Sequence, residues 1–413
     1  MATPKLSREV AQQAVDEYTK ADGIQTVAAK ALGIPVATMQ SRLRSANTMG
    51  IKPSPGVVDK RNPSYMAQQI KRLEAELKTK NDKDSDLDVI KGIVWGMKQS
   101  AADYVPPEWS VTPPKKESSP GVPTLFLSDL HWAETVYPSQ VNGVNKYNLA
   151  IARERLHTAV ESGIELLRII DPKMRYPGVV CPLGGDMFSG NIHDELTATN
   201  EINSMPAVLD LYGHLVNVVN RLVQVFGRVM LPCVTGNHGR NTQKIWNKDR
   251  HHTSFDWLLY QFLAKHFESD KRVTFFIPDG PDAYYRIYGH KYLLTHGDQF
   301  RGGDSMIGCL GPIIRGDHKK RSRNGQIDMD YDVMIMGHWH QYIHHNRVIV
   351  NGSLKGYDEY AYNNSFGFES PQQALWVTHP KYGITFRMPV YVDRQRNVPK
   401  TAWTSIAETK GAS

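Results

Sequence analysis

The stretch Leu125-Phe126-Leu127-Ser128-Asp129-Leu130-His131 places a short apolar run directly before an aspartate and a histidine. Such a run is typical of a buried strand, and the polar residues after it fall in the loop at the strand's end. Four later apolar runs lead in the same way into polar motifs. These motifs are Gly185-Asp186, Gly236-Asn237-His238, His296-Gly297-Asp298 and Gly337-His338-Trp339-His340.

These five loops are expected to meet at one edge of a sheet, because buried strands that end in polar loops bring those loops together. Together they offer Asp, Asn and several His side chains, which is a metal-binding inventory large enough for two ions. Mixed imidazole and carboxylate ligands suit Mn, Fe or Zn better than Ca.

The surrounding pattern predicts the fold class. Helical spacing is found at about 147–170, 206–226 and 254–268. Strand-like runs follow at about 273–277, 284–288 and 291–295, with a hairpin that joins 374–379 to 384–391. Because helices alternate with strands first and strands dominate later, we expect an α/β fold, a layered α/β sandwich with two β-sheets.

The five motifs, in this order, resemble the calcineurin-like metallophosphoesterase superfamily over residues 124–390. The resemblance implies two metal ions, with Asp186 shared between them. The implied ligands are Asp129, His131, Asp186 and His340 for one ion, and Asp186, Asn237, His296 and His338 for the other. His238 would be no ligand, and would protonate the leaving oxygen or stabilise the transition state.

The sequence departs from that family after the Gly-Asn-His motif, where many relatives carry an acidic residue. Here Gly239 and Arg240 follow. The group that orients His238 must therefore come from elsewhere, and Asp298 is one candidate. Arg240 is placed to contact a phosphate, although an exposed, solvated arginine is the alternative.

The residues after Gly185-Asp186 also differ from well-known relatives. Met187-Phe188-Ser189 stands where protein Ser/Thr phosphatases carry Asp-Arg-Gly, which weakens that interpretation. SbcD-type nucleases carry Gly-Asp-Leu-Phe-His, and His193 is a candidate to replace the missing histidine. The stretch 185–196 looks like phosphoesterases encoded by phages and prophages.

A glycine-rich, basic stretch at 301–323 lies between the fourth and fifth motifs. We expect a loop there, and its ends should lie near the site. Arg315, Lys319 and Lys320 could then contact a polyphosphate backbone by charge. An ordinary solvated loop is the alternative.

The N-terminal region carries most of the net charge. The whole chain of 413 residues has a formal charge of +7, and residues 1–80 hold thirteen Lys/Arg against seven Asp/Glu. A basic module on a near-neutral body suggests a polyanionic partner.

Residues 7–20, 25–32 and 35–44 read as helices, with a glycine-containing turn between the last two. This is the plan of a helix-turn-helix unit. The stretch resembles the C-terminal DNA-binding unit of the factor for inversion stimulation, which implies a partner, DNA, and a second helix in the major groove. The residues that would face DNA are Thr38, Gln40, Ser41, Arg42 and Arg44. A small helical bundle that binds protein is the alternative.

The sequence predicts four parts: a helix-turn-helix domain at 1–50, a linker at 51–123, the metallophosphoesterase domain at 124–393 and a polar tail at 394–413. The linker holds an amphipathic helix at 64–80, which could support a homodimer, and a Pro-rich tether at 105–123. Three cysteines, no signal peptide and no long apolar run favour a cytoplasmic protein without a membrane span, bacterial or in a phage-infected host.

Together these features predict a two-metal phosphodiesterase, a DNA nuclease with Mn²⁺ in use and Fe or Zn as alternatives. Metal-activated water would attack phosphorus. One alternative is a phosphomonoesterase, or a protein or cyclic-nucleotide phosphatase, localised by its DNA-binding module. A second alternative is a DNA-binding regulator with little activity.

Overall fold

The computed structural model describes residues 6–21, 24–55, 105–113, 119–302 and 308–393. The chain divides into two units, Met1–Gly92 and Ile93–Ser413, and each is described by itself. The predicted helix at 64–80 and the tail after residue 393 lie outside the described residues. Within the described ranges, no helix is both long enough and apolar enough to cross a membrane.

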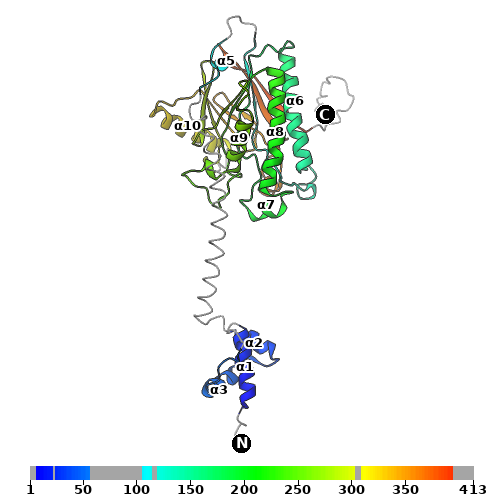
Figure 1. The fold of residues 1–413 in the computed structure, drawn as a ribbon, viewed down its shortest axis with the longest axis vertical. Helices are drawn as coiled ribbons and strands as arrows, with labels where there is room; N and C mark the ends of the chain where they lie inside the picture. The colour runs from blue at the N-terminus through cyan, green and yellow to red at the C-terminus, as the bar shows by residue number, and fades with distance from the viewer. Residues whose placement is uncertain (1–5, 22–23, 56–104, 114–118, 303–307, 394–413) are drawn as a thin grey trace, which may run out of the picture. The chain divides into compact units, whose positions relative to one another are not determined.

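Within its described residues, the first unit contains three helices (Figure 1): α1 (Arg8–Lys20), α2 (Gln25–Ala31) and α3 (Val36–Thr48). Ser7 caps α1 by accepting a hydrogen bond from the backbone N–H of Val10 at 3.3 Å. Gly33, with φ of 62°, makes the turn between α2 and α3. The small core consists of Ala14, Ala28, Ala29 and Met39, with Tyr18, Ala21, Leu32, Ile34 and Leu43 packed against it.

The second unit is built on two sheets, as the sequence predicted. The first holds β1 (Val122–Phe126), β2 (Val179–Val180), β3 (Val229–Pro232), β4 (Val273–Phe276), β10 (Gln372–His379) and β11 (Gly383–Tyr391), in the order β11-β10-β1-β2-β3-β4. The second holds β5 (Asp282–Ile287), β6 (His290–Thr295), β7 (Val333–Met336), β8 (Ile343–His344) and β9 (Val348–Val350), in the order β5-β6-β7-β9-β8. Strands β1 to β4 are mutually parallel, and β6 is parallel to β7.

The two sheets pack face to face through one set of alternating side chains. Phe126 of β1 and Tyr292 of β6 both contact the Trp376 ring, at centroid distances of 6.4 and 6.3 Å. The Tyr292 hydroxyl also lies 2.7 Å from the Thr378 hydroxyl, which links β6 to β10. This packing fixes the ends of β1, β2 and β3 relative to those of β6 and β7.

Three long helices cover the outer face of the first sheet: α6 (Leu149–Ile170), α8 (Ser204–Phe226) and α9 (Phe255–His266) (Figure 1, green). Asn148 caps α6 through a hydrogen bond from the backbone N–H of Ile151 at 2.9 Å. The shorter elements are α7 (Asp194–Thr199), α11 (Glu359–Asn363), η2 (Pro138–Gln140) and η3 (His251–Thr253). The three long helices α6, α8 and α9 begin and end within two residues of the predicted ranges. Their prediction succeeded because each carries an apolar stripe at helical spacing that faces the sheet.

The basic stretch expected as a loop is instead helix α10 (Leu310–Gly325), which corrects the sequence prediction. Pro312 stands in its first turn, where a proline costs no helical hydrogen bond. Ile313 and Phe300 pack with Met334 of β7, and Gly316 lies against the Phe300 ring. Tertiary packing therefore stabilises a helix whose glycines and proline read as a loop.

The Pro-rich segment also differs from the extended tether expected. Residues Glu108–Val111 form the short helix α5, and Trp109 is buried between the two sheets. The Ser110 carbonyl accepts a hydrogen bond from the backbone N–H of Tyr288 at 2.6 Å. This part of the segment thus belongs to the packed body.

Candidate metal centre

The five polar loops converge at one edge of the body. Asp129 follows β1, Asp186 follows β2 and Asn237 follows β3. His296 follows β6, and His338 with His340 follows β7. Parallel strands carry their carboxyl ends to the same edge within each sheet, and the packing of the two sheets then brings the two sets of loops together.

Three groups of side chains at this edge could each hold a metal ion, with ligand atoms within 4.8 Å of one another. The groups share His131 and Asp186, so they form one continuous site. They are Asp129, His131 and His340; His131, Asp186 and His238; and Asp186, His296 and His338. Asn237 joins them through its Oδ1 atom, 3.2 Å from Nε2 of His296.

The surroundings of His296 fit a cation. Its Nδ1 lies 2.8 Å from the Gly184 carbonyl oxygen and therefore carries the ring proton. The other nitrogen, Nε2, faces Asp186 Oδ2 at 2.9 Å and Asn237 Oδ1 at 3.2 Å. Burial opposes charge on this ring, but Asp186 outweighs it and raises the pKa of His296 to about 10. When Nε2 carries no proton, it and these two oxygens are three electron-pair donors around one point, the set that a divalent metal requires.

The backbone at this edge is strained. Five of the predicted ligands have φ in the left-handed region, which costs a non-glycine residue about 1 kcal/mol or more. They are Asp129 (54°), His131 (47°), Asp186 (49°), His338 (69°) and His340 (53°). Strain of this kind clusters at functional sites, because it aims side chains that an ordinary loop would leave apart.

Two glycines are required by close approach to the aspartates. A Cβ atom on Gly236 would collide with Oδ1 of Asp186, and one on Gly337 would collide with Oδ2 of Asp129. The neighbouring backbone N–H groups use this proximity. His238 donates to Asp186 Oδ1 at 2.7 Å, and His338 donates to Asp129 Oδ1 at 2.8 Å.

His131 is oriented by Glu134, a buried carboxylate that was not predicted from the sequence. Its Nδ1 lies 3.1 Å from Oε2 of Glu134, and Glu134 in turn accepts from Lys355 Nζ at 2.8 Å. Lys355 also pairs with Asp358 at 2.5 Å. Burial opposes ionisation of Glu134, but Lys355 outweighs it and lowers the pKa of this carboxyl. A carboxylate behind a histidine fixes the ring nitrogen available to a metal.

His238 is oriented by a backbone carbonyl and not by Asp298. Its Nδ1 lies 3.0 Å from the Ser189 oxygen, whereas Asp298 pairs with Arg250 at 2.8 Å. The His238 ring stacks edge-on against His131, with centroids 4.6 Å apart. His193 stands just before α7, exposed, with its ring centroid 6.4 Å from that of His238. The predicted substrate-binding His193 is therefore close to the site.

Arg240 is engaged with its own loop. Its guanidinium donates to the carbonyl oxygens of Asn237 at 2.7 Å, Thr242 at 3.0 Å and Gln243 at 3.3 Å. All three nitrogens therefore hold the loop that carries Asn237. Contact of Arg240 with a phosphate stays a prediction, and it would require these bonds to be exchanged.

The basic residues of α10 divide into two kinds. Arg315 and Lys319 are exposed. Lys320 is buried and pairs with Asp282 at 2.5 Å, and Arg323 reaches the other oxygen of Asp282 at 3.0 Å. Contact of Lys320 with a phosphate stays a prediction, and it would require this ion pair with Asp282 to be exchanged.

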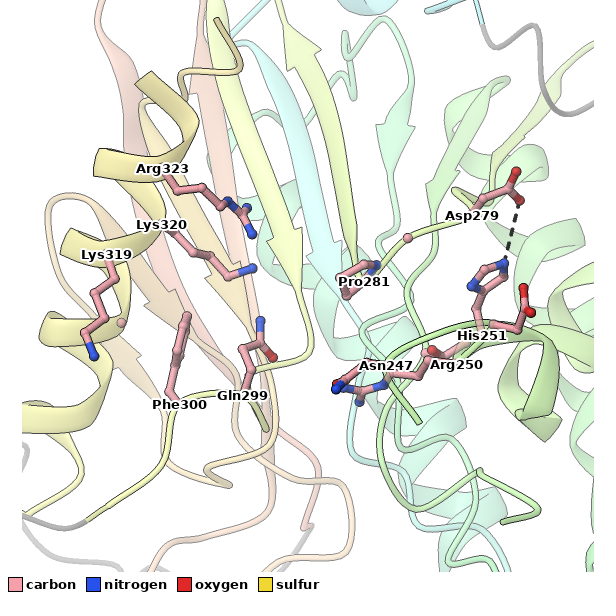
Figure 2. Close-up of a pocket in the computed structure, with 14 residues that line it drawn as sticks. Asn247, Arg250, His251, Asp279, Pro281, Gln299, Phe300, Lys319, Lys320 and Arg323 are labelled. Carbon is pink, nitrogen blue, oxygen red and sulfur yellow. Dashed lines mark ion pairs between the residues drawn. The ribbon is translucent and has the colours of Figure 1, made fainter. Parts of the chain in front are cut away.

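A cavity of about 400 Å³ opens beside α10. In Figure 2, Lys319, Lys320 and Arg323 stand on one side of it, and Asn247, Arg250 and Pro281 on the other. Lys320 and Arg250 are paired with Asp282 and Asp298. The net positive charge of the cavity is therefore smaller than the number of its lysines and arginines implies.

The five predicted DNA contacts all lie on α3 of the first unit. Gln40, Ser41 and Arg44 are exposed, whereas Thr38 and Arg42 are half-buried. None of these five belongs to the small core, which takes Met39 and Leu43 from the same helix.

No protein-family model matches the chain, and no curated protein matches it either. The solved structures that match at low identity include the following. A conserved uncharacterized protein of Streptococcus pneumoniae, described as a predicted phosphoesterase, is 10% identical, with 63% of this chain and 84% of that chain covered and a TM-score of 0.24. Vacuolar Protein Sorting 29 of Cryptosporidium parvum is 14% identical, with 62% and 84% covered and a TM-score of 0.24. The sulfate thiohydrolase SoxB of Thermus thermophilus is 8% identical, with 68% and 59% covered and a TM-score of 0.28.

Proposed function

We propose that this protein is a two-metal phosphodiesterase that hydrolyses DNA. The observation that carries the metal chemistry is the position of Asp186. Its carboxylate belongs to two of the three candidate metal groups at this edge, one with His131 and His238 and one with His296 and His338. It lies 2.9 Å from Nε2 of His296, which is also 3.2 Å from Oδ1 of Asn237. A shared carboxylate between two histidine-rich groups is what a pair of bridged ions requires.

In this proposal, seven side chains bind the metal ions and His238 acts as the general acid. Asp129, His131 and His340 would hold one ion, and Asn237, His296 and His338 the other, with Asp186 between them. When bound, a pair of divalent ions, Mn²⁺ in our proposal, neutralises phosphoryl charge and supplies a nucleophile at neutral pH. His238 stands beside His131, with Nδ1 held by Ser189, so its Nε2 is the atom that donates a proton to the leaving oxygen.

DNA is the proposed substrate because of the first unit. Its α3 carries the five predicted DNA-contacting residues, all outside the small core, and residues 1–80 have an excess of six positive charges. Basic residues on one helix after a short glycine turn suit the major groove of a duplex. The unit would bring the phosphodiesterase body to its substrate by electrostatic attraction.

An activity assay with the full chain tests this proposal. Purified protein with Mn²⁺ is given linear, nicked and single-stranded DNA, beside p-nitrophenyl phosphate and its bis-ester. We expect cleavage of DNA and of the bis-ester, with loss of activity in chelator. Activity on the monoester alone would exclude the nuclease and favour a phosphomonoesterase, and binding of DNA without any hydrolysis would favour a regulator.

The role of His238 needs a separate variant, because its ring also lies within ligand distance of His131 and Asp186. His238→Ala should keep two metal ions per chain and lose about 100-fold or more in rate, the usual loss when a general acid is removed. Metal content is measured by mass spectrometry. The matched control is His214→Ala, a half-exposed ring over Trp132. Loss of metal in His238→Ala would make His238 a ligand.

A further inference from the structure

Asp256 is a fully buried carboxylate, with 0% exposure, beside the loops that carry the proposed ligands. Its Oδ2 accepts backbone N–H bonds from Asp186 at 3.1 Å and from Gly236 at 2.9 Å. Its Oδ1 accepts a third from Met187 at 3.2 Å. Because one loop follows β2 and the other follows β3, a single side chain ties the two together.

These bonds are not the capping of a helix. Asp256 is the second residue of α9 (Figure 1), but Ser254 caps that helix by accepting from the backbone N–H of Asp256 at 3.2 Å. The carboxylate of Asp256 instead points at loops outside its own helix. The three N–H groups that bond its oxygens reduce the cost of burying this carboxylate.

Gly239 leaves the space that this carboxylate fills. A Cβ atom on Gly239 would lie 2.7 Å from Oδ1 of Asp256 and 2.9 Å from its Cγ. The two segments are also bonded directly, since the Gly239 carbonyl accepts from the backbone N–H of Phe255 at 2.7 Å. Gly239 has an ordinary φ, so only the closeness of Asp256 excludes a side chain at position 239.

We propose that Asp256 is a positioning residue of the metal centre. It sets the spacing between the loop of Asp186 and the loop of Asn237 and His238, and it does so from the place that an acidic side chain at position 239 would occupy. The inference rests on the proposed function, because it assigns Asp256 to the same metal site.

Asp256→Ala tests the inference through metal affinity, which needs no assay of the loaded enzyme. We expect the Mn²⁺ dissociation constant, measured by calorimetry on metal-free protein, to rise about 10- to 100-fold, as for outer partners of other metal sites. Asp256→Asn, which keeps the volume and one acceptor oxygen, should show a smaller rise in the same direction. If Asp256→Ala does not fold, the Mn²⁺ affinity of Asp256→Asn still tests the inference.

Asp171 provides a matched control. It is also a buried carboxylate, 3% exposed, and it accepts backbone N–H bonds from Lys173 at 3.3 Å and Arg175 at 2.8 Å at the end of α6. Asp171→Ala should lower the melting temperature of metal-free protein and leave the Mn²⁺ dissociation constant unchanged. This separates a loss of general stability from a loss of positioning.

A transfer of the carboxylate gives the sharpest result. In the double variant Gly239→Asp with Asp256→Gly, the new side chain enters the same space from the opposite loop. We expect it to recover most of the Mn²⁺ affinity lost in Asp256→Gly, whereas Gly239→Asp alone should weaken binding by crowding Asp256. A merely structural role for Asp256 in α9 would not be rescued from position 239.

The outcomes separate this inference from the proposed function. If wild-type protein binds Mn²⁺ and Asp256→Ala binds it equally well, only the role of Asp256 is overturned. The same holds if the double variant binds no better than Asp256→Gly. If wild-type protein binds no divalent metal, the proposed function is overturned, and this inference with it.

Discussion

The edge that carries the candidate metal groups and helix α10 use charged side chains in opposite ways, although both were expected to take part in the reaction site. At the edge, several histidines and aspartates bring atoms that can bind a metal close together, such as Asp186 Oδ2 and His296 Nε2, which lie 2.9 Å apart. On α10, Lys320 lies 2.5 Å from Asp282, so opposite charges meet and cancel. A cluster of histidines and aspartates indicates a site for a cation, whereas an isolated buried pair of opposite charges indicates a structural role.

The largest effect is expected at the edge. Asp186→Asn removes the carboxylate that two candidate metal groups share, so we expect metal binding to weaken by more than about 100-fold, the upper end for losing an outer partner of a metal ligand. Activity should fall with it. Metal content by mass spectrometry and hydrolysis of a phosphodiester check this, with circular dichroism as the control for folding. Full metal content in this variant would contradict the shared position of Asp186.

The ion pair between Lys320 of α10 and Asp282 is expected to contribute to the stability of the fold and not to metal binding. Asp282→Asn leaves Lys320 buried without its partner, which costs about 3 to 5 kcal/mol of unfolding free energy. For a unit of this size the melting temperature should fall by roughly 10 °C. Asp330→Asn removes the partner of Lys291 from an exposed pair and should change the melting temperature little. Unchanged stability in Asp282→Asn would contradict the comparison.

The same ion pair predicts a pH dependence. Burial opposes ionisation of Asp282, but Lys320, with hydrogen bonds from Lys320 and Arg323, outweighs it and lowers the pKa of the carboxyl. A lowered pKa stabilises the fold above the ordinary carboxyl value of about 4, and this contribution is lost as the pH falls through the folded value. The difference in melting temperature between wild type and Asp282→Asn should therefore shrink below about pH 4. A difference that grows in acid would be the contrary result.

The sequence predicted that the polar loops converge at one edge, because the signal for this arrangement is local. Each motif directly follows the strand that delivers it, as Gly185-Asp186 follows β2, and a parallel arrangement then brings the strand ends together. The helix predicted at 206–226 is α8, Ser204–Phe226, for the same reason: its apolar stripe is contained in its own residues.

The sequence missed the features whose partners lie far along the chain. Glu134 and Lys355 meet across 221 positions, and Lys320 and Asp282 meet across 38. No local pattern marks such a pair. Helix α10 was missed because Gly311, Pro312 and Gly316 favour a loop, and only packing against Phe300 and β7 makes the helix stable.

Arg240 could have a structural role or could contact the substrate, and a variant distinguishes the two. Its bonds to three carbonyl oxygens suggest that Arg240→Ala costs about 1 to 2 kcal/mol of stability and lowers kcat by loosening the loop of Asn237. A phosphate contact would instead raise KM with stability unchanged. Thermal melting and steady-state kinetics on the bis-ester are measured together. Arg240→Lys, which keeps the charge and loses the fork of donors, should behave like the alanine variant if the loop is what matters.

The smallest effect is expected for DNA binding by α3. The comparison is between Arg44 on that helix and Lys20 on α1, which forms an ion pair. Arg44→Ala in the full chain should weaken DNA binding modestly and reduce the slope of log affinity against log salt by about 1, as for one lost phosphate contact. Lys20→Ala is the control, because Lys20 pairs with Glu17 on α1 at 2.6 Å. Fluorescence anisotropy over a salt series measures both. Equal slopes in wild type and Arg44→Ala would mean that α3 does not carry this phosphate contact, and equal losses in the two variants would mean that only overall charge attracts DNA.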